Sequence, residues 1–289
     1  MSRLHQLHTE HVWLDYGTGP VVQDLTMAIP AGDLTAIVGA NGCGKSTLLR
    51  GMARLMRPSS GTVQLDGQDL HAQSSRQVAR NLGILPQSPV APEGILVADL
   101  VARGRYPHQH WLHRDEEQDA RAVDAALAAT GTSELAHRPM DSLSGGQRQR
   151  VWVAMALAQD PGILLLDEPT TFLDVSHQLD VLDLLADLNS TSGTTVVMVL
   201  HDLNLAARYA DHLVVMGQGQ VLTHGTPAEV VTPEVVAEAF ALTCQVIEDP
   251  VTGTPMVVPV SRHHRARPGH QPAPATPSGA ALESKEIPS

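Results

Sequence analysis

The sequence has little cysteine, few aromatic side chains, a deficit of positive charge and no long apolar run, and each shortage excludes a class of protein. Two cysteines in 289 residues, Cys43 and Cys244, cannot form a disulfide framework, which favours a reducing compartment. No segment approaches the ~18–20 consecutive apolar residues that cross a bilayer. The first residues also lack the apolar core of a signal peptide. If the protein acts at a membrane, we therefore expect another chain to hold it there.

Charge and aromatic content argue against nucleic acid as a partner. Lys and Arg together number 19 and Asp and Glu number 31, which gives a formal charge of −12. A surface this acidic is a poor electrostatic match for a phosphate backbone. Aromatic residues make up only 3% of the chain, so platforms for stacking bases are scarce. We therefore expect no nucleic-acid partner.

Short apolar segments alternate with amphipathic ones over most of the chain, which predicts an α/β fold with a parallel sheet. We expect strands at His11–Tyr16, Val21–Ile29, Leu34–Val38, Thr62–Leu65, Leu82–Leu85, Ile163–Leu166, Thr195–Leu200, His212–Met216 and Val221–His224. We expect helices at Lys45–Leu55, Val97–Gly104, Asp115–Thr130, Gly145–Gln159, Ser176–Asn189 and Leu203–Tyr209. Two short helices and two short strands are expected to complete the fold near Val260.

The alternation is interrupted once and stops before the end of the chain. Between residues 89 and 158, helical patterns follow one another with no clear strand, which predicts a helical subdomain inserted into a core of 1–88 and 159–260. The domain as a whole is expected to span 1–260. The last 29 residues, 261–289, contain five prolines and almost no large apolar side chain, so they are predicted to form a disordered tail.

A glycine-rich loop between an expected strand and an expected helix predicts a nucleotide site. Gly39, Gly44, Lys45 and Ser46 have the spacing of a P-loop. Its backbone amides and the N-terminus of the following helix would cradle phosphates. Lys45 would reach the terminal phosphates, and the Ser46 hydroxyl would be offered to Mg²⁺.

Polar residues that follow other expected strands complete this site. Asp167 ends the strand Ile163–Leu166 and is expected to hold the Mg²⁺ shell. Glu168 follows directly and is the candidate base for the attacking water, a role worth about 10²–10⁴ in rate. His201 ends another apolar strand, which places it in the same crevice and favours a γ-phosphate contact. Gln87 also follows a strand and is a candidate contact for the metal or the water.

The segment Leu143-Ser144-Gly145-Gly146-Gln147 turns this pattern into a family resemblance. Two glycines at a helix N-terminus expose amides to an anion, and together with the P-loop the segment resembles the signature of ATP-binding cassette (ABC) ATPases. The resemblance covers about residues 4–260, and its motifs stand in the order typical of the family. They are Tyr16 (A-loop), Gly39–Ser46 (Walker A), Gln87 (Q-loop), Ser142–Gln147 (signature), Asp167-Glu168 (Walker B), Leu173-Asp174 (D-loop) and His201 (H-loop).

The resemblance implies a fold, cofactors and site residues. The fold would be that of an α/β P-loop NTPase (RecA-like), an ABC nucleotide-binding domain with an N-terminal antiparallel β subdomain and an inserted α-helical subdomain. The cofactors would be ATP and Mg²⁺. Nucleotide would be bound by Tyr16, Gly39, Asn41, Gly42, Gly44, Lys45, Ser46, Thr47, Ser144, Gly145, Gly146, Gln147 and Asp174. Catalysis would rest on Glu168, His201 and Gln87, and the metal would be held by Ser46, Gln87 and Asp167.

The resemblance also implies partners. In the family, the signature of one subunit closes on the ATP that the other subunit holds, so hydrolysis implies a homodimer. Closure would be passed to integral membrane permease subunits, which dock in a groove near Gln87 and Val90–Arg103. A periplasmic or surface substrate-binding protein would take part indirectly. The chain is therefore expected at the cytoplasmic face of the cell membrane, as a peripheral subunit.

A narrower resemblance concerns the transported substrate. The segments Gly104–His108, Ser144–Gln159, Glu168–Gln178 and His201–Asn204 resemble the ATPase subunits of ferric-siderophore importers. The ATPases of haem and cobalamin importers are similar, so these cargoes remain alternatives. An exporter ATPase is a further alternative. A soluble ABC protein acting on DNA or ribosomes is disfavoured by the single cassette and by the charge of −12.

Overall fold

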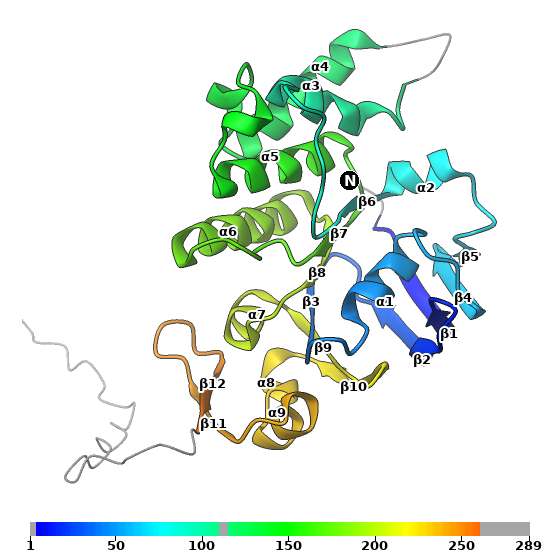
Figure 1. Cartoon of the computed structure of the whole chain (residues 1–289), viewed down its shortest axis with the longest axis vertical. Helices are drawn as coiled ribbons and strands as arrows, with labels where there is room; N and C mark the ends of the chain where they lie inside the picture. The colour runs from blue at the N-terminus through cyan, green and yellow to red at the C-terminus, as the bar shows by residue number, and fades with distance from the viewer. Residues whose placement is uncertain (1–3, 110–114, 261–289) are drawn as a thin grey trace, which may run out of the picture.

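A six-stranded sheet runs through the centre of the protein (Figure 1). The computed structural model describes residues 4–109 and 115–260, and the segment predicted to be a disordered tail, 261–289, lies outside them. The sheet has the order β10-β9-β3-β8-β7-β6, in which all neighbours except β10 and β9 are parallel. The strands are β3 (Leu34–Gly39), β6 (Leu82–Leu85), β7 (Ile163–Asp167), β8 (Thr195–Val199), β9 (His212–Gly217) and β10 (Gln220–Gly225).

A second, antiparallel sheet has the order β2-β1-β4-β5. Its strands are β1 (Leu7–Asp15), β2 (Pro20–Ile29), β4 (Ser60–Leu65) and β5 (Gln68–Asp69). The ladder between β1 and β4 shifts register near His11, whose φ is 49°. A Cβ atom on Gly61 would lie 2.1 Å from the His11 carbonyl oxygen, so only glycine fits at this irregularity between the two paired strands.

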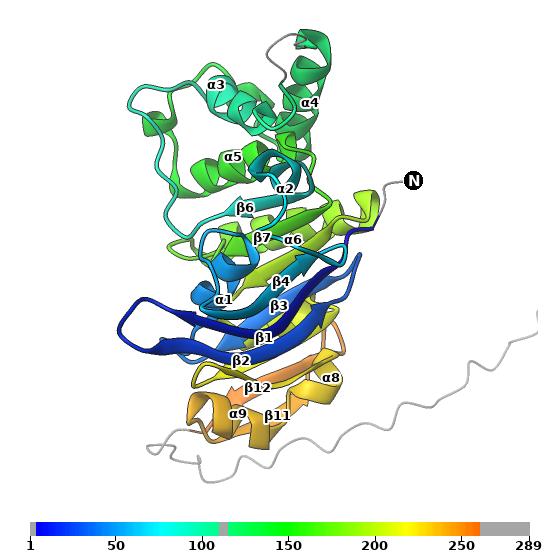
Figure 2. The ribbon, with the colours of Figure 1, turned by 90° about the vertical axis from the view of Figure 1, so that its right-hand side faces the viewer.

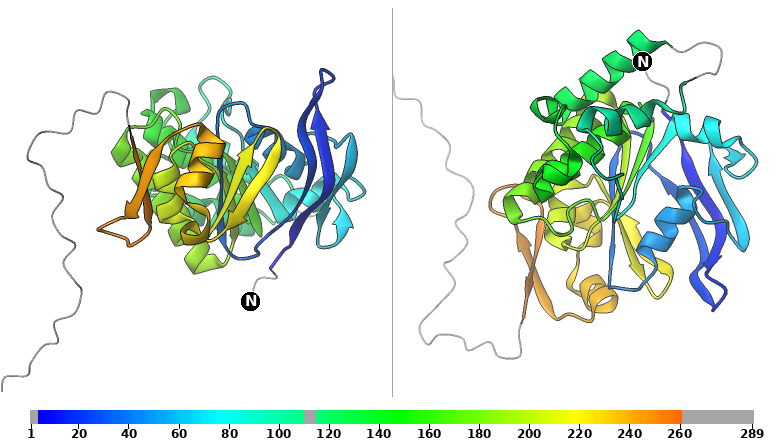
Figure 3. Two further views of the ribbon diagram at one scale, coloured as in Figure 1. Left: turned by 90° about the horizontal axis from the view of Figure 1, so that it is seen from below. Right: turned by 45° about the horizontal axis from the view of Figure 1, so that its top comes forward.

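A two-stranded hairpin near the C-terminal end of the described chain is separate from both larger sheets. Its strands are β11 (Cys244–Glu248) and β12 (Pro255–Pro259). Figure 3 shows the antiparallel sheet, in blue, and this hairpin, in orange, on opposite sides of the central sheet. The hairpin has no strand neighbour in the described residues, so its position depends on the helices against which it packs.

Helices cover the central sheet and form a separate group at one end. They are α1 (Lys45–Met52), α2 (Ser75–Asn81), α3 (Val97–Ala102), α4 (Glu116–Ala129), α5 (Gly145–Ala158), α6 (Val175–Ser192), α7 (Leu203–Tyr209), α8 (Pro227–Val230) and α9 (Pro233–Phe240). Figure 2 shows α3, α4 and α5 together, away from the antiparallel sheet. Among the residues that the structure describes, no helix has the length and apolar character to cross a membrane.

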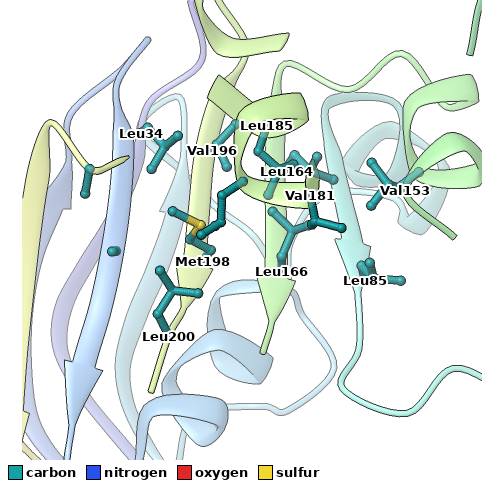
Figure 4. Packing of buried hydrophobic residues seen from close by; sticks show 14 of the residues in the cluster. Leu34, Leu85, Val153, Leu164, Leu166, Val181, Leu185, Val196, Met198 and Leu200 are labelled. Carbon is teal, nitrogen blue, oxygen red and sulfur yellow. The ribbon is translucent and has the colours of Figure 1, made fainter. Parts of the chain in front are cut away.

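The central strands are buried on both faces, and alternate side chains enter two different cores. Leu164 and Leu166 of β7 pack with Met198 of β8 in the core under α5, α6 and α7 (Figure 4). Ile163 and Leu165 point the other way, into the core shared with α1 and the antiparallel sheet. Burying each such side chain contributes about 1.5–3 kcal/mol. This two-sided burial explains why the strands read as continuous apolar runs in the sequence.

The helical group is held together by a close approach of backbones and by a buried ion pair. A Cβ atom on Gly104 would lie 2.2 Å from the Met155 carbonyl oxygen, so glycine lets this turn approach α5. Arg105 Nε donates to Asp119 of α4 at 2.9 Å, and Arg105 Nη1 donates to the Ala158 carbonyl at 2.8 Å. These contacts join the segment after α3 to both α4 and α5.

Three local predictions are corrected by the structure. The helix predicted to reach Leu55 ends at Met52, because Arg54 turns into the left-handed region with φ 62°. Helix α2 was not predicted. Only Val78 of its seven residues is buried, so the segment lacks the apolar periodicity by which a helix is recognised in a sequence. Strand β1 begins at Leu7, before the register shift at His11 that interrupts its alternation.

Candidate nucleotide and catalytic site

The predicted catalytic residues follow strands that lie next to one another in the sheet. Strand β3 leads into the P-loop, and the register places β8 beside it, then β7, then β6. Parallel strands present their carboxyl ends at the same edge. The residues that follow β6, β7 and β8 are therefore brought to the edge where the P-loop begins.

The P-loop is tightly wrapped around its own lysine. Gly39 has φ 151°, and a Cβ atom there would lie 2.2 Å from the carbonyl oxygen of Met216. Gly44, at the start of α1, has φ 104°. Lys45 is buried, and its Nζ donates to the carbonyl oxygens of Gly39 at 2.8 Å and Ala40 at 3.1 Å. The ammonium group therefore already lies over the loop that would hold phosphates.

The first residues of α1 meet the end of β7. Ser46 Oγ donates to Asp167 Oδ1 at 2.7 Å. Burial raises the pKa of Asp167, against the lowering effect of the Ser46 hydrogen bond. A hydroxyl and a carboxylate are oxygen ligands of the kind that Mg²⁺ prefers, and a cation would stabilise the charged form of this poorly solvated carboxylate. The residues present therefore fit a magnesium site.

Glu168 collects three hydrogen bonds from different parts of the chain. Its Oε1 lies 2.7 Å from His201 Nε2. Its Oε2 accepts from Gln87 Nε2 at 2.5 Å and from Thr171 Oγ1 at 2.9 Å. Burial raises the pKa of Glu168, but the hydrogen bonds from Thr171, His201 and Gln87 outweigh it and lower the pKa overall. The carboxylate is therefore ionised at neutral pH and can accept a proton.

Thr171 is not among the residues that the sequence analysis singles out. It lies one turn beyond Glu168, with its backbone N–H donating to the Glu168 carbonyl at 3.2 Å. Glu168 itself has φ 55°, a left-handed conformation that costs on the order of 1–3 kcal/mol in a residue other than glycine. The spacing of Thr171 from Glu168 could have indicated this contact. A hydroxyl residue three positions after an acidic residue, with a proline between them, is typical of a turn.

The predicted adenine contact lies beside the P-loop helix. Tyr16 is 54% exposed, and its hydroxyl is 3.3 Å from Thr47 Oγ1 and accepts from Arg50 Nη1 at 3.3 Å. Asn41 and Gly42 are exposed at the tip of the loop. An accessible aromatic ring tied to α1 is suited to stack on a base.

The predicted signature residues lie elsewhere, at the N-terminus of α5. Ser144 Oγ accepts from the Gln147 backbone N–H at 3.3 Å, and the Gln147 side chain accepts from the Ser144 N–H at 3.1 Å, which completes a capping box. Gly145 and Gly146 form the first turn of the helix. Figure 1 shows α5 in the helical group, apart from α1. The structure therefore divides the predicted nucleotide-binding residues into two groups within the chain.

The signature packs against the predicted D-loop. Asp174 caps α6, and its Oδ1 lies 2.7 Å from His177 Nδ1 and accepts from the His177 backbone N–H at 3.0 Å. A Cβ atom on Gly146 would lie only 2.3 Å from the His177 ring. Phe172 and Val175, on either side of Asp174, are 93% and 71% exposed. The signature and the D-loop thus form one continuous surface with exposed apolar side chains.

The close approach of Gly146 to His177 leads to a prediction. We expect Gly146→Ala to lower ATP hydrolysis about 5- to 150-fold, because an overpacked contact of this kind costs about 1–3 kcal/mol. The His177→Ala change removes the obstructing ring, so the double variant should recover most of the loss. Steady-state hydrolysis by the three variants tests this. A double variant no better than Gly146→Ala alone would show that the contact is not the cause.

Comparisons with known proteins place this geometry in a family. The family profile described as ABC transporter matches residues 22–171. The petrobactin import ATP-binding protein of Bacillus anthracis is 51% identical over 261 residues, which cover 90% of this chain and 96% of that protein. The achromobactin transport ATP-binding protein of Dickeya dadantii is 53% identical over 249 residues, covering 86% and 93%. A cobalamin import ATP-binding protein of Halobacterium salinarum is 44% identical over 240 residues, covering 83% and 60%.

The fold comparison agrees. A solved ABC transporter described as of the metal-chelate type, in an inward-facing conformation, superposes with a TM-score of 0.77 at 30% identity, covering 89% of this chain and 98% of that one. The protein belongs to the ABC transporter family. The expected class, an α/β P-loop NTPase with an antiparallel β part and a group of helices, is therefore confirmed.

Proposed function

We propose that this chain is the ATP-hydrolysing subunit of a ferric-siderophore importer. The observation that carries the hydrolytic part is the convergence of Gln87, Thr171 and His201 on the Glu168 carboxylate, beside the Ser46–Asp167 contact. The cargo is supported by the relatives at 51% and 53% identity, whose names refer to petrobactin and achromobactin.

The reaction follows from where the side chains lie. The phosphates of ATP would lie against the P-loop amides and the N-terminus of α1, and Lys45 would exchange its carbonyl partners for phosphate oxygens. Water attacks the γ-phosphorus, the bond to the β-phosphate oxygen breaks, and ADP leaves. Glu168 accepts the proton of that water, and His201 orients Glu168 while contacting the γ-phosphate.

We propose that Mg²⁺ is held by Ser46, Asp167 and Gln87. When bound, Mg²⁺ would neutralise charge on the phosphate oxygens. In the structure Gln87 donates to Glu168, so its amide links the proposed base to the proposed metal site. The Asp167 carboxylate lies at the end of a fully buried strand, which keeps its position rigid.

We propose that hydrolysis occurs in a homodimer. The signature and the D-loop share one surface, and Phe172 and Val175 expose apolar side chains on it. Exposed apolar groups beside anion-binding amides are suited to a second copy that carries ATP on its own P-loop. Asp174 lies on the same surface, at the cap of α6.

The proposed permease contact lies in a groove between the α/β core and the helical group. Val90 and Tyr106 are 88% and 62% exposed. The groove proposed near Gln87 and Val90–Arg103 would receive a segment of the membrane subunits. The chain would then be peripheral at the cytoplasmic face, with a substrate-binding protein acting on the far side and no nucleic acid involved.

A haem or cobalamin cargo is the alternative, and an exporter is less favoured. The cobalamin relative is less similar, at 44% identity, than the two siderophore relatives. The catalytic geometry does not discriminate between cargoes, because the nucleotide site and the cargo lie on different subunits of such a transporter. Cargo therefore has to be tested by transport.

Uptake in iron-starved cells tests the proposal. We expect cells that carry only Glu168→Gln to lose uptake of radiolabelled iron–siderophore while they keep uptake of labelled haem and cobalamin. Glu117→Gln is the matched control, since Glu117 is exposed on α4 and pairs with Arg121 at the surface. Loss of haem or cobalamin uptake instead would move the protein to the alternative cargo. Intact uptake of all three would contradict the importer assignment.

A further inference from the structure

The helix that follows His201 is held by the C-terminal hairpin, a part of the fold that the proposed reaction does not use. Helix α7 is only seven residues long and begins two residues after His201. Asp202 caps it, with Oδ1 accepting from the backbone N–H groups of Asn204 at 2.8 Å and Leu205 at 3.0 Å. Any shift of α7 is therefore transmitted through a capped turn to His201.

The first contact between α7 and the hairpin is a pair of hydrogen bonds with one residue of β12. Asn204 Nδ2 donates to the Val257 carbonyl at 3.1 Å, and the Val257 N–H donates to Asn204 Oδ1 at 2.7 Å. A side-chain amide that pairs with both backbone groups of one residue fixes orientation as well as distance. Val257 is buried, so water does not readily replace this pair.

The second contact is an ion pair one turn further along α7. Arg208 lies four residues after Asn204 and therefore on the same face of the helix. Its Nη2 and Nε donate to Asp249 Oδ2 at 2.6 and 3.2 Å. The Asp249 carboxylate is buried, and its other oxygen accepts from the Val251 N–H at 2.9 Å. Hydrogen bonding to Arg208 and to Val251 lowers the pKa of Asp249 to about 2, so the pair is charged at neutral pH.

The hairpin needs these contacts for its own position. Strands β11 and β12 pair only with each other in the described structure, and an isolated two-stranded hairpin is marginally stable. It packs against α7 through β12 and against α9 through β11. A cavity of about 220 Å³ lies between these parts, lined by residues that include His201, Asn204 and Val257. The hairpin therefore reaches the immediate surroundings of His201.

Helix α7 is also tied on its other side. The Tyr209 hydroxyl donates to Asp183 Oδ1 on α6 at 2.6 Å. Helix α6 starts from Asp174 in the D-loop, so α7 lies between the hairpin and the helix that carries part of the proposed dimer surface. Helix α7 is thus held on two sides. On the side of the hairpin, its contacts are with residues that lie 41 to 53 positions later in the chain.

We infer that Asn204 and the Arg208–Asp249 pair are positioning residues for ATP hydrolysis, through which the C-terminal hairpin holds His201 in place against Glu168. This inference rests on the proposed function, because it assigns a role within the same reaction. The contact at stake is the 2.7 Å separation of His201 Nε2 and Glu168 Oε1. A displacement of about 1 Å at such a site can cost about 10²-fold in rate.

Hydrolysis kinetics of hairpin variants test the inference. We expect Asn204→Ala and Asp249→Asn in the full chain to lower kcat about 10- to 100-fold, with the KM for ATP changed less than about twofold because neither residue contacts the P-loop. Arg208→Lys keeps the charge and should lose less than Asp249→Asn. Gln245→Ala is the matched control, since Gln245 lies exposed on β11 of the same hairpin. Thermal unfolding of each variant identifies any that fails to fold.

A double-variant cycle separates positioning from a general loss of structure. In a His201→Ala chain, measured by single-turnover hydrolysis, Asn204→Ala and Asp249→Asn should cause no further loss, because they act through the missing imidazole. Losses that multiply in that background, or wild-type kcat in both single variants, would overturn the inference. The proposed function is judged separately, by whether the wild type hydrolyses ATP and Glu168→Gln does not.

Discussion

Glu168→Gln is expected to bind ATP normally and to lose hydrolysis by about 10²–10⁴-fold. The amide has nearly the shape of the carboxylate, and its oxygen can still accept from Thr171. It cannot take up the proton of the attacking water, whereas the Glu168 carboxylate, which its lowered pKa keeps ionised at neutral pH, has a free site for that proton. In the proposed dimer ATP drives closure and hydrolysis drives reopening, so the variant should also accumulate as a nucleotide-bound dimer.

Phosphate release, nucleotide retention and mass in solution measure these three effects. The variant should show near-zero release of phosphate, retained ATP after gel filtration, and twice the monomer mass with ATP but not with ADP. Glu117→Gln serves again as the control for a Glu-to-Gln change at an exposed position. Turnover close to that of the wild type would remove Glu168 from the role of base.

Asp167→Asn is expected to give the second large effect, a loss of Mg²⁺-dependent hydrolysis by about 10²-fold or more. Metal contacts to phosphoryl oxygens are worth several kcal/mol in the transition state, and each 1.4 kcal/mol is about tenfold in rate. The change should not destabilise the fold, because burial already raises the pKa of Asp167 and so disfavours its charged form. The Ser46 hydroxyl can still donate to the amide oxygen.

Nucleotide binding with and without chelator provides a readout that does not depend on turnover. In the wild type, ATP affinity should rise when Mg²⁺ replaces EDTA; in Asp167→Asn it should stay at the EDTA value. Equal thermal unfolding temperatures of the two proteins without nucleotide would exclude misfolding as the cause. If the variant kept the wild-type response to Mg²⁺, the metal site would have to be moved away from Asp167.

Much of the nucleotide site could be predicted because its signals are local. Gly39, Gly44 and Lys45 lie within a stretch of seven residues, and their spacing alone specifies a loop that wraps phosphates. Asp167 and Glu168 follow an apolar strand directly, and Ser144 precedes Gln147 by the interval of a capping box. In each case the backbone conformation depends on neighbours in the chain, which a sequence pattern records.

Contacts between distant segments were less accessible to sequence reasoning. Gln87 and Glu168 are 81 residues apart, and only the order of β6 and β7 in the sheet brings their side chains together. The sequence showed no strong hydrophobic pattern at Thr171, in α2 or in the early part of β1, because few side chains there are large and buried. The register shift at His11 further obscured the alternation in β1.

The sequence by itself determined the class of the protein, its P-loop and the chemical types of its catalytic groups, since these follow from residues close together in the chain. The tertiary structure alone decided that three side chains converge on Glu168, that the signature packs on His177, and that the hairpin reaches α7 through Asp249. Arg208 and Asp249 are 41 residues apart. Such pairs depend on how buried faces pack, and packing is a property of the whole chain rather than of any segment.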